Sequence, residues 1–309
     1  MPASRAQPEG EPDGHWAATK VDEQIARARS TGILAGLFGN DISGSRSPFL
    51  HQREADAQGL RLVYRLYDFA ALGLGPADLG PMLRSAADMG FAGLNITYPF
   101  KQSVVALLDE LTDNAARVGA VNTVIFAGGR MIGENTDSLG FAESLGRGLP
   151  GVTLSRVVQI GAGGAGAATA DALLAAGTQE LVLVEVDPER ARALADNLRL
   201  SYPGRAIRIG EDAAFEIGLA DGLVNATPIG MEGHPGAPVP AEAIHAGLWV
   251  ADIVYFPLAT ALLRTARAIG CRTLDGSGMV VFQAAAAFDA FTGCEADRDR
   301  MLRSFAEFG

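Results

Sequence analysis

Short apolar runs alternate along the chain with stretches in which apolar residues recur at helical spacing. Helices are expected at Pro48–Gly59, with Ser47 as its N-cap, at Ala77–Met89, and from Pro99 onward. Strands that alternate with such helices predict a mostly parallel sheet. In the first half of the chain, the apolar runs predict strands at Leu34–Phe38, Val63–Tyr67, Ala92–Ile96 and Ala120–Phe126, the last with a hairpin through Gly128–Gly129 into Met131–Ile132.

The second half of the chain continues the alternation around a glycine-rich loop. A helix is expected from Asp137 to about Leu149, and a helix with few polar residues, Met279–Thr292, is expected to pack back on the first half. The pattern between them is that of a doubly wound parallel sheet of the Rossmann type. Its strands are expected at Val157–Ile160, Leu181–Val184, Ala206–Ile209, Gly222–Asn225, Val250–Val254 and Arg272–Leu274.

The predicted fold class is therefore α/β with two domains. Residues 31–136 plus 276–309 form an N-terminal α/β domain, and residues 137–275 form a Rossmann-type doubly wound parallel sheet. Residues 1–30 open with a polar stretch rich in Pro and Gly, which predicts a flexible tail rather than a signal peptide. Without a targeting signal, the expected compartment is the cytoplasm.

Charge and composition argue against several classes of function. The formal net charge of −11 repels phosphate backbones and anionic lipids, so no nucleic-acid or membrane partner is expected. No apolar stretch of about 18 residues is present to cross a bilayer. The 2 cysteines and 4 histidines show no metal-ligand spacing, so we expect no metal.

The glycine-rich loop fits the pattern G-x-G-x-x-G, with a predicted strand just before it and a predicted helix just after. Gly161 permits a tight turn, Gly163 lets the backbone approach a pyrophosphate, and Gly166 lets helix and strand pack closely. The helix N-terminus adds unpaired N–H groups that favour an anion. A dinucleotide site is therefore predicted at Gly161, Ala162, Gly163, Gly164, Ala165 and Gly166.

An acidic residue follows the next predicted strand and bears on the choice of cofactor. Glu185 stands where a carboxylate accepts hydrogen bonds from the adenine-ribose hydroxyls, and it would repel a 2′-phosphate. Asp187 competes for this role, and Arg190 lies close enough to complicate it. We therefore expect NAD as the cofactor, with NADP less favoured.

Polar clusters in the first half of the chain come near the ends of predicted strands. Two hydroxyls at a helix start could hold a carboxylate, although Ser47 could equally be a simple cap. Lysine is usually a surface residue, and Asp137 could cap the helix that it begins. The clusters are Ser45 with Ser47, then Asn95, Thr97 and Lys101, then Asn122 and Asp137.

Together these segments resemble the shikimate/quinate dehydrogenase family, in particular its NAD-preferring quinate/shikimate branch. The motifs SRSP, NITYPFK, GAVNT, GENTD, GAGGAG, NATPIGM, DIVYFP and GMVVFQ occur in the family's order between about Gly36 and Gly293. The resemblance implies that Lys101 and Asp137 are the catalytic pair. It further implies substrate contacts from Ser45, Ser47, Asn95, Thr97, Asn122, Tyr255 and Gln283, and cofactor contacts from Asn225, Thr227, Met231 and Gly278.

The function implied by this resemblance is NAD-dependent oxidation of the C3 hydroxyl of shikimate or quinate, in a substrate-binding catalytic domain next to an NAD-binding one. Gly44 and Tyr98 depart from the common family pattern and bear on the choice of substrate. One alternative is an NADP-specific biosynthetic shikimate dehydrogenase, against which Glu185 argues. Another is a non-catalytic NAD-binding regulator, against which the intact Lys101 and Asp137 argue. The expected partner is the small-molecule substrate, in a monomer or a homodimer.

Overall fold

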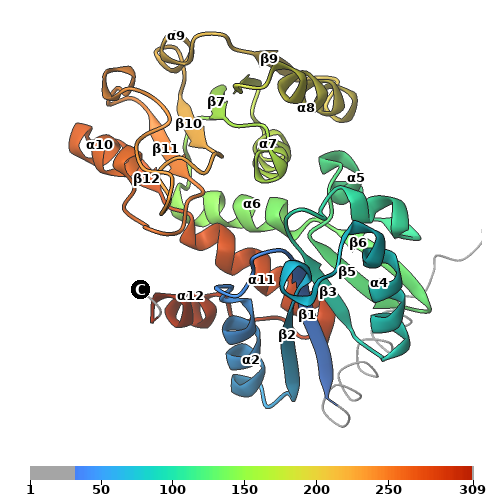
Figure 1. The fold of residues 1–309 in the computed structure, drawn as a ribbon. Coiled ribbons are helices and arrows are strands. Elements are labelled where there is room, and N and C mark those ends of the chain that lie inside the picture. Colours follow the sequence, from blue (N-terminus) through green and yellow to red (C-terminus); the bar gives the residue numbers. More distant parts are fainter. Residues whose placement is uncertain (1–31, 308–309) are drawn as a thin grey trace, which may run out of the picture.

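The computed structural model describes residues 32–307, and its strands form two separate six-stranded sheets (Figure 1). The predicted flexible tail lies outside the described residues. None of the helices in the described part of the chain is long and apolar enough to cross a membrane.

The first sheet has the order β2-β1-β3-β5-β6-β4. Strands β1, β2 and β3 are parallel, as predicted, whereas the β5–β6 hairpin adds antiparallel pairs. The strands are β1 (Ile33–Gly39), β2 (Leu62–Asp68), β3 (Gly93–Ile96), β4 (Glu110–Leu111), β5 (Thr123–Ala127) and β6 (Arg130–Glu134). The helices of this part are α2 (Ser47–Ala57), α3 (Phe69–Leu72), α4 (Leu79–Asp88) and α5 (Asp113–Val118), with 3-10 helices at η1 (Pro76–Asp78) and η2 (Ser103–Leu107).

The second sheet is wholly parallel and has the order β12-β11-β10-β7-β8-β9. This order is the Rossmann arrangement, so the predicted doubly wound sheet is confirmed. Its strands are β7 (Arg156–Ile160), β8 (Glu180–Val184), β9 (Ala206–Ile209), β10 (Gly222–Asn225), β11 (Trp249–Asp252) and β12 (Arg272–Leu274). The helices are α6 (Thr136–Gly148), α7 (Gly164–Ala175), α8 (Pro188–Ser201), α9 (Ala213–Ile217) and α10 (Ala261–Ile269), with the 3-10 helix η3 (Ala241–Ala243).

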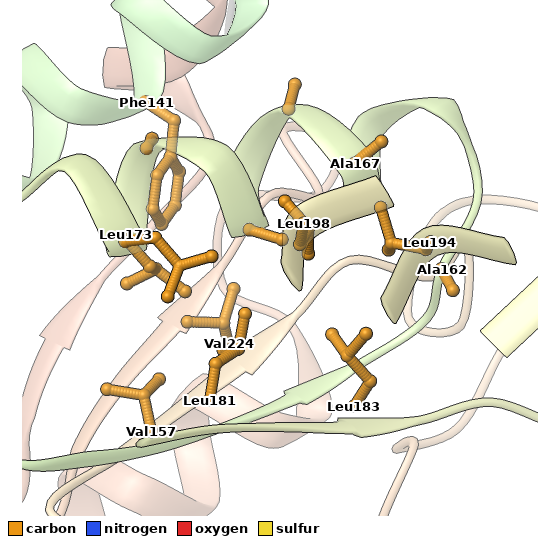
Figure 2. Packing of buried hydrophobic residues seen from close by; sticks show 14 of the residues in the cluster. Phe141, Val157, Ala162, Ala167, Leu173, Leu181, Leu183, Leu194, Leu198 and Val224 are labelled. Carbon is orange, nitrogen blue, oxygen red and sulfur yellow. The ribbon is translucent and has the colours of Figure 1, made fainter. Parts of the chain in front are cut away.

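Small side chains bring α7 close to the second sheet. Ala168 and Ala172 are buried on this helix, and its Leu173 packs with Leu181 of β8 and Leu198 of α8 (Figure 2). Because the first turn of α7 lies directly after β7, this packing fixes where the helix N-terminus points. The glycine-rich loop is thus held on a rigid support.

Two long helices meet where the two sheets adjoin. Helix α11 (Ser277–Thr292) runs along α6 (Figure 1), and each contributes a glycine at the closest approach. A methyl group on Gly140 would lie 2.6 Å from the backbone nitrogen of Gln283, and one on Gly278 would collide with Ser144. The far end of α11 packs Phe291 against β1, so the predicted return to the first half is confirmed. Helix α12 (Arg298–Ala306) completes this side.

Several local predictions are wrong. Helix α2 begins at Ser47 itself, and the preceding Arg46 occupies the N-cap position without a side-chain hydrogen bond. After Pro99 the chain forms a turn and then the short 3-10 helix η2, whose β-branched Val104 and Val105 do not favour an α-helix. The strand expected from Ala120 begins only at Thr123.

Candidate active site

A cavity of about 680 Å³ opens at the carboxyl ends of β1 and β3 and is lined from both halves of the molecule. Parallel strands deliver their last residues to one edge of a sheet, which explains why motifs far apart in the sequence meet here. All the residues predicted for catalysis and substrate binding lie in its wall: Ser45, Ser47, Asn95, Thr97, Lys101, Asn122, Asp137, Tyr255 and Gln283.

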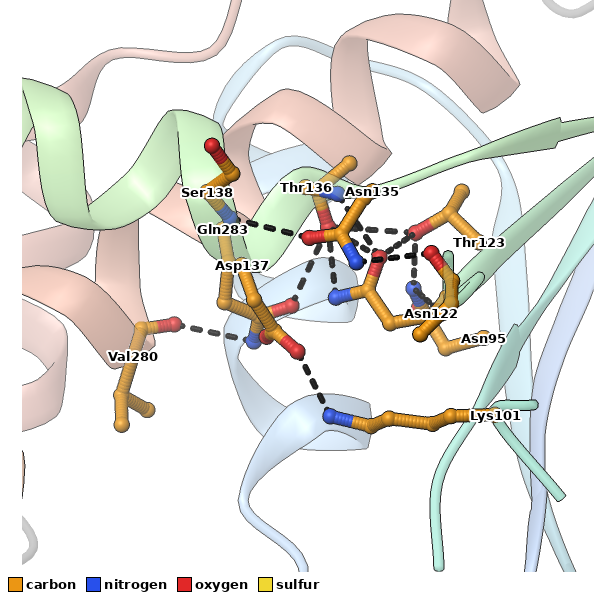
Figure 3. Close-up of polar contacts among 11 residues, drawn as sticks. Asn95, Lys101, Asn122, Thr123, Asn135, Thr136, Asp137, Ser138, Val280 and Gln283 are labelled. Atoms are coloured by element: carbon orange, nitrogen blue, oxygen red, sulfur yellow. Dashed lines mark hydrogen bonds and ion pairs between the residues drawn. The ribbon is translucent and has the colours of Figure 1, made fainter. Parts of the chain in front are cut away.

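Lys101 and Asp137 lie side by side in the wall of this cavity. The Nζ atom of Lys101 donates a hydrogen bond to Oδ2 of Asp137 over 2.6 Å (Figure 3). The two side chains keep 24% and 12% of their surface exposed, so the pair is mostly shielded but still within reach of a ligand. Asn135, not Asp137, caps α6 by accepting from the Ser138 N–H. The Asp137 carboxylate is therefore not used as a cap and is directed at the lysine.

The two serines of the SRSP motif sit at the start of α2. The Ser45 hydroxyl accepts from the Ser47 N–H over 3.3 Å and donates to the Ser47 hydroxyl over 3.2 Å. The Arg46 N-cap makes no side-chain hydrogen bond to the helix, and Pro48 has no N–H to donate, so the two serine hydroxyls are the polar side-chain groups that the start of α2 presents to the cavity. Two hydroxyls at a positive helix end provide donors suited to a carboxylate.

A buried hydrogen-bond network fixes the amide groups of Asn95 and Asn122 (Figure 3). The Asn95 Nδ2 donates to the backbone carbonyl of Asn122 and to the Thr123 hydroxyl. The Asn95 Oδ1 accepts from the Tyr64 hydroxyl over 2.8 Å. The Asn122 Oδ1 accepts from the Thr136 N–H over 2.7 Å. Both donor hydrogens of the Asn95 amide are thus in use, whereas its oxygen keeps a second lone pair.

The Asn122 amide complements this arrangement. Its Nδ2 donates to the Thr136 hydroxyl over 3.0 Å and retains one further donor hydrogen. Gln283 enters from α11 and is fixed by donating to the Val280 carbonyl over 3.0 Å. The site therefore presents acceptors, donors and one ion pair to the same space, which suits a ligand with several hydroxyl groups.

The glycine-rich loop has the geometry that its sequence predicts. Gly161 has a φ of +100°, and a methyl group on Gly166 would lie 2.5 Å from the Gly161 carbonyl oxygen. Gly163 and Gly164, by contrast, have open space where a side chain would be. They begin α7 and line a second cavity of about 820 Å³. Backbone N–H groups facing an open cradle fit the pyrophosphate of a dinucleotide.

Glu185 lies at the end of β8, beside this loop. Its Oε2 accepts from the Ala162 N–H over 2.7 Å, and its Oε1 accepts from the Asp187 N–H over 3.1 Å. Asp187 caps α8. The Arg190 guanidinium lies 3.9 Å from Glu185 and 3.6 Å from Asp187. Two carboxylates and one guanidinium therefore lie beside the loop, and the guanidinium already interacts with both carboxylates.

The remaining predicted cofactor residues divide into two groups. Thr227 and Met231 line the second cavity, and Met231 also reaches the first. Asn225 is fully buried and donates to the Ile229 carbonyl and to Asp252, so it shapes the loop after β10. Burial raises the pKa of that Asp252 carboxyl. Gly278 lies in the contact between α6 and α11, and its role in cofactor binding stays a prediction.

Sequence reasoning did not identify the groups that hold the site in shape. Tyr64, Thr123, Asn135 and Thr136 orient the amides and the first turn of α6. Thr123, Asn135 and Thr136 stand inside the GAVNT and GENTD motifs, so their position was a usable signal. Tyr64 lies 31 residues from Asn95 in an ordinary strand pattern, and nothing local marks it. Within residues 32–307, no group of three or more His, Cys, Asp or Glu could hold a metal ion.

Comparisons with known proteins agree with this geometry. A sequence model of the shikimate dehydrogenase substrate binding domain matches residues 37–124, and one of the shikimate 5′-dehydrogenase C-terminal domain matches residues 276–304. A shikimate dehydrogenase (NADP(+)) of Streptomyces avermitilis is 56% identical over 89% of this chain and 95% of its own length.

Relatives described with the other cofactor are also close. A quinate/shikimate dehydrogenase (NAD(+)) of Corynebacterium efficiens is 48% identical over 88% of this chain and 97% of its own length. Among solved structures, quinate dehydrogenase from Corynebacterium glutamicum in complex with NAD matches with a TM-score of 0.85 and 44% identity. That match covers 89% of this chain and 99% of the other.

Proposed function

Because this chain belongs to the shikimate dehydrogenase family, we propose that it catalyses the reversible oxidation of the C3 hydroxyl of quinate or shikimate, with NAD as the preferred cofactor. The observation that carries the proposal is the Lys101–Asp137 pair, held at 2.6 Å in a cavity that adjoins the glycine-rich loop. The two cavities share Ala165, Met231 and Tyr255 in their walls, so a substrate and a dinucleotide would meet between them.

Oxidation of a secondary alcohol requires a proton to leave the hydroxyl while a hydride leaves the carbon. A bound nicotinamide supplies the hydride acceptor. Lys101 Nζ donates a hydrogen bond to Asp137 Oδ2, and in this proposal the pair receives the hydroxyl proton. The chain has 25 Lys and Arg residues, and only Lys20 and Lys101 are lysines. A lysine at position 101 is therefore an exception to the arginines used elsewhere. An arginine could not serve there because its guanidinium does not release a proton.

The polar network assigns directions to the substrate hydrogen bonds. Asn95 can only accept from a ring hydroxyl, since both of its amide hydrogens are already donated within the protein. Asn122 can still donate through its second amide hydrogen. Ser45 and Ser47, at the N-terminus of α2, would receive the substrate carboxylate. A cyclic polyol with one carboxylate fits this set of groups.

The preference for NAD rests on the charges beside the glycine-rich loop. Glu185 is buried against the loop backbone, and Arg190 already interacts with it and with Asp187. A 2′-phosphate would bring further negative charge next to these carboxylates, whereas ribose hydroxyls would donate to them. The charges beside the loop therefore favour NAD, and the chain is similar to relatives described with each of the two cofactors.

The test is steady-state reduction of NAD and of NADP by the purified full chain, with quinate and shikimate each supplied. Lys101→Met should lower kcat by at least about 10³-fold, and Lys20→Met, which changes the chain's other lysine, should leave it unchanged. Turnover with NADP alone would refute the cofactor preference and keep the family reaction. Binding of NAD without turnover of either acid would instead support a non-catalytic regulator.

A further inference from the structure

A buried carboxylate on α7 has no part in the chemistry described so far. Asp171 is fully buried, yet it accepts hydrogen bonds from three different elements. Its Oδ1 accepts from Arg117 Nε on α5 over 2.9 Å and from the Tyr202 hydroxyl after α8 over 2.7 Å. Its Oδ2 accepts from the Ser138 hydroxyl on α6 over 2.8 Å. Both carboxylate oxygens are therefore satisfied, as a buried charge requires.

The position of the three donors shows what this carboxylate connects. Ser138 directly follows Asp137 in the first turn of α6, and Asp171 lies two turns along α7 from the glycine-rich loop. Arg117 brings in α5, and its backbone carbonyl accepts from Asn197 of α8. One side chain thus links the helix that would hold the dinucleotide to the turn that carries Asp137 of the proposed catalytic pair.

The Tyr202 contact has a different character from the Ser138 contact. Tyr202 follows α8, which packs beside α7 on the same sheet, so this hydrogen bond does not involve the turn of α6 that carries Asp137. Burial, together with the hydrogen bond to Asp171, raises the pKa of Tyr202 to about 12, and its hydroxyl remains a donor at neutral pH. Only Ser138, of these two donors, adjoins Asp137.

We infer that Asp171 is a positioning residue, which acts through Ser138 to fix the Asp137 carboxylate relative to the bound dinucleotide. The inference rests on the dehydrogenase function proposed above. Hydride transfer depends steeply on the distance and alignment of the reacting groups, and a misplacement of about 1 Å can cost about 100-fold in rate. The Ser138–Asp171 hydrogen bond joins α7 to the first turn of α6, directly beside Asp137, where such a misplacement would arise.

Two single-atom deletions separate positioning from general stability. Ser138→Ala and Tyr202→Phe each remove one hydroxyl donor from the same carboxylate. Ser138→Ala should lower kcat about tenfold, with the KM values for NAD and quinate within about twofold of the unchanged protein. It should also increase the isotope effect measured with substrate deuterated at the oxidised carbon, because hydride transfer becomes slower. Tyr202→Phe should lower the melting temperature about as much as Ser138→Ala does, while its kcat and isotope effect stay those of the unchanged protein. Equal effects of the two variants on kcat would overturn the inference.

A readout independent of turnover keeps this inference separate from the proposed reaction. In hydrogen–deuterium exchange, NAD should slow exchange in residues 136–139 of the unchanged protein and of Tyr202→Phe, but not of Ser138→Ala. If NAD leaves exchange in this turn unchanged in all three proteins, the coupling through Asp171 is refuted. Absence of turnover with any substrate in the unchanged protein would refute the proposed reaction, and the exchange result would still decide the coupling.

Discussion

His51 should make this protein sensitive to mild acid. The imidazole is fully buried on α2, and neither ring nitrogen has a hydrogen-bond partner among the described residues. It stacks on Tyr64 with ring centroids 4.6 Å apart, and Phe288 and Phe291 lie at 6.2 and 6.0 Å. Burial without a partner lowers the pKa of His51 from 6.5 to about 3.

Whether acid lowers or raises the stability follows from the pH at which the folded and the unfolded state each protonate His51. The unfolded chain protonates His51 below about pH 6.5, whereas the folded protein does so only near pH 3. The contribution of the neutral ring to stability is therefore complete above pH 6.5 and is lost progressively as the pH falls toward 3. At pH 5, about 1.5 pH units below the unfolded value, the loss is about 2 kcal/mol, at about 1.36 kcal/mol per unit.

The assay is urea denaturation of the unchanged protein and of His51→Phe at pH 7 and at pH 5. His51→Phe keeps an aromatic ring in the stack and removes the titrating group, so its free energy of unfolding should fall by about 2 kcal/mol less between the two pH values. His234→Phe, at an exposed position, is the matched control and should behave like the unchanged protein. An equal fall for all three proteins would show that His51 does not carry the acid sensitivity.

Three further predictions concern the site. Asp137→Asn should lower kcat by about 10²- to 10³-fold at pH 7, because an amide cannot take up a proton as the carboxylate can; a KM change without a kcat change would contradict this. Tyr64→Phe should raise the KM for quinate about threefold to tenfold, because the Asn95 amide loses the donor that orients it, and an unchanged KM would oppose that role. Gly166→Val should abolish NAD binding in a fluorescence titration, because its side chain would collide with the Gly161 carbonyl; Gly164→Ala, at an open position, should weaken binding far less.

Most strands and helices could be predicted from local sequence patterns, because the interactions that form them act over short stretches of chain. The apolar runs at Ala206–Ile209 and Gly222–Asn225 match β9 and β10 residue for residue. Errors concentrate where two local signals compete. Ser47 is a good cap by type, but Ser45 accepts its N–H and the helix begins one residue earlier than predicted.

The site itself was predicted as a set of residues, but not as a network. Motif order could name Asn95 and Asn122, and the carboxyl ends of strands explained why they meet. It could not say which amide hydrogens are already donated, because the acceptors are distant in sequence: the Thr136 hydroxyl lies 14 residues from Asn122, and the Thr123 hydroxyl lies 28 residues from Asn95. Such contacts depend on the register between strands and on helix packing, and neither is readable from one stretch of sequence.

The choice of cofactor needs a variant that separates charge from geometry at Glu185. Its carboxylate has two functions in the structure: it accepts from the Ala162 N–H of the loop, and it carries the negative charge that would repel a 2′-phosphate. Glu185→Ala removes both and should weaken NAD and NADP alike through a disordered loop. Glu185→Gln keeps a carbonyl oxygen for the Ala162 N–H and removes the charge, together with the acceptor for the Asp187 N–H, so NADP use should rise by at least about tenfold relative to NAD. If the kcat/KM ratio for the two cofactors is the same in Glu185→Gln and the unchanged protein, the charge of Glu185 does not set the preference, and Asp187 with Arg190 becomes the determinant to test.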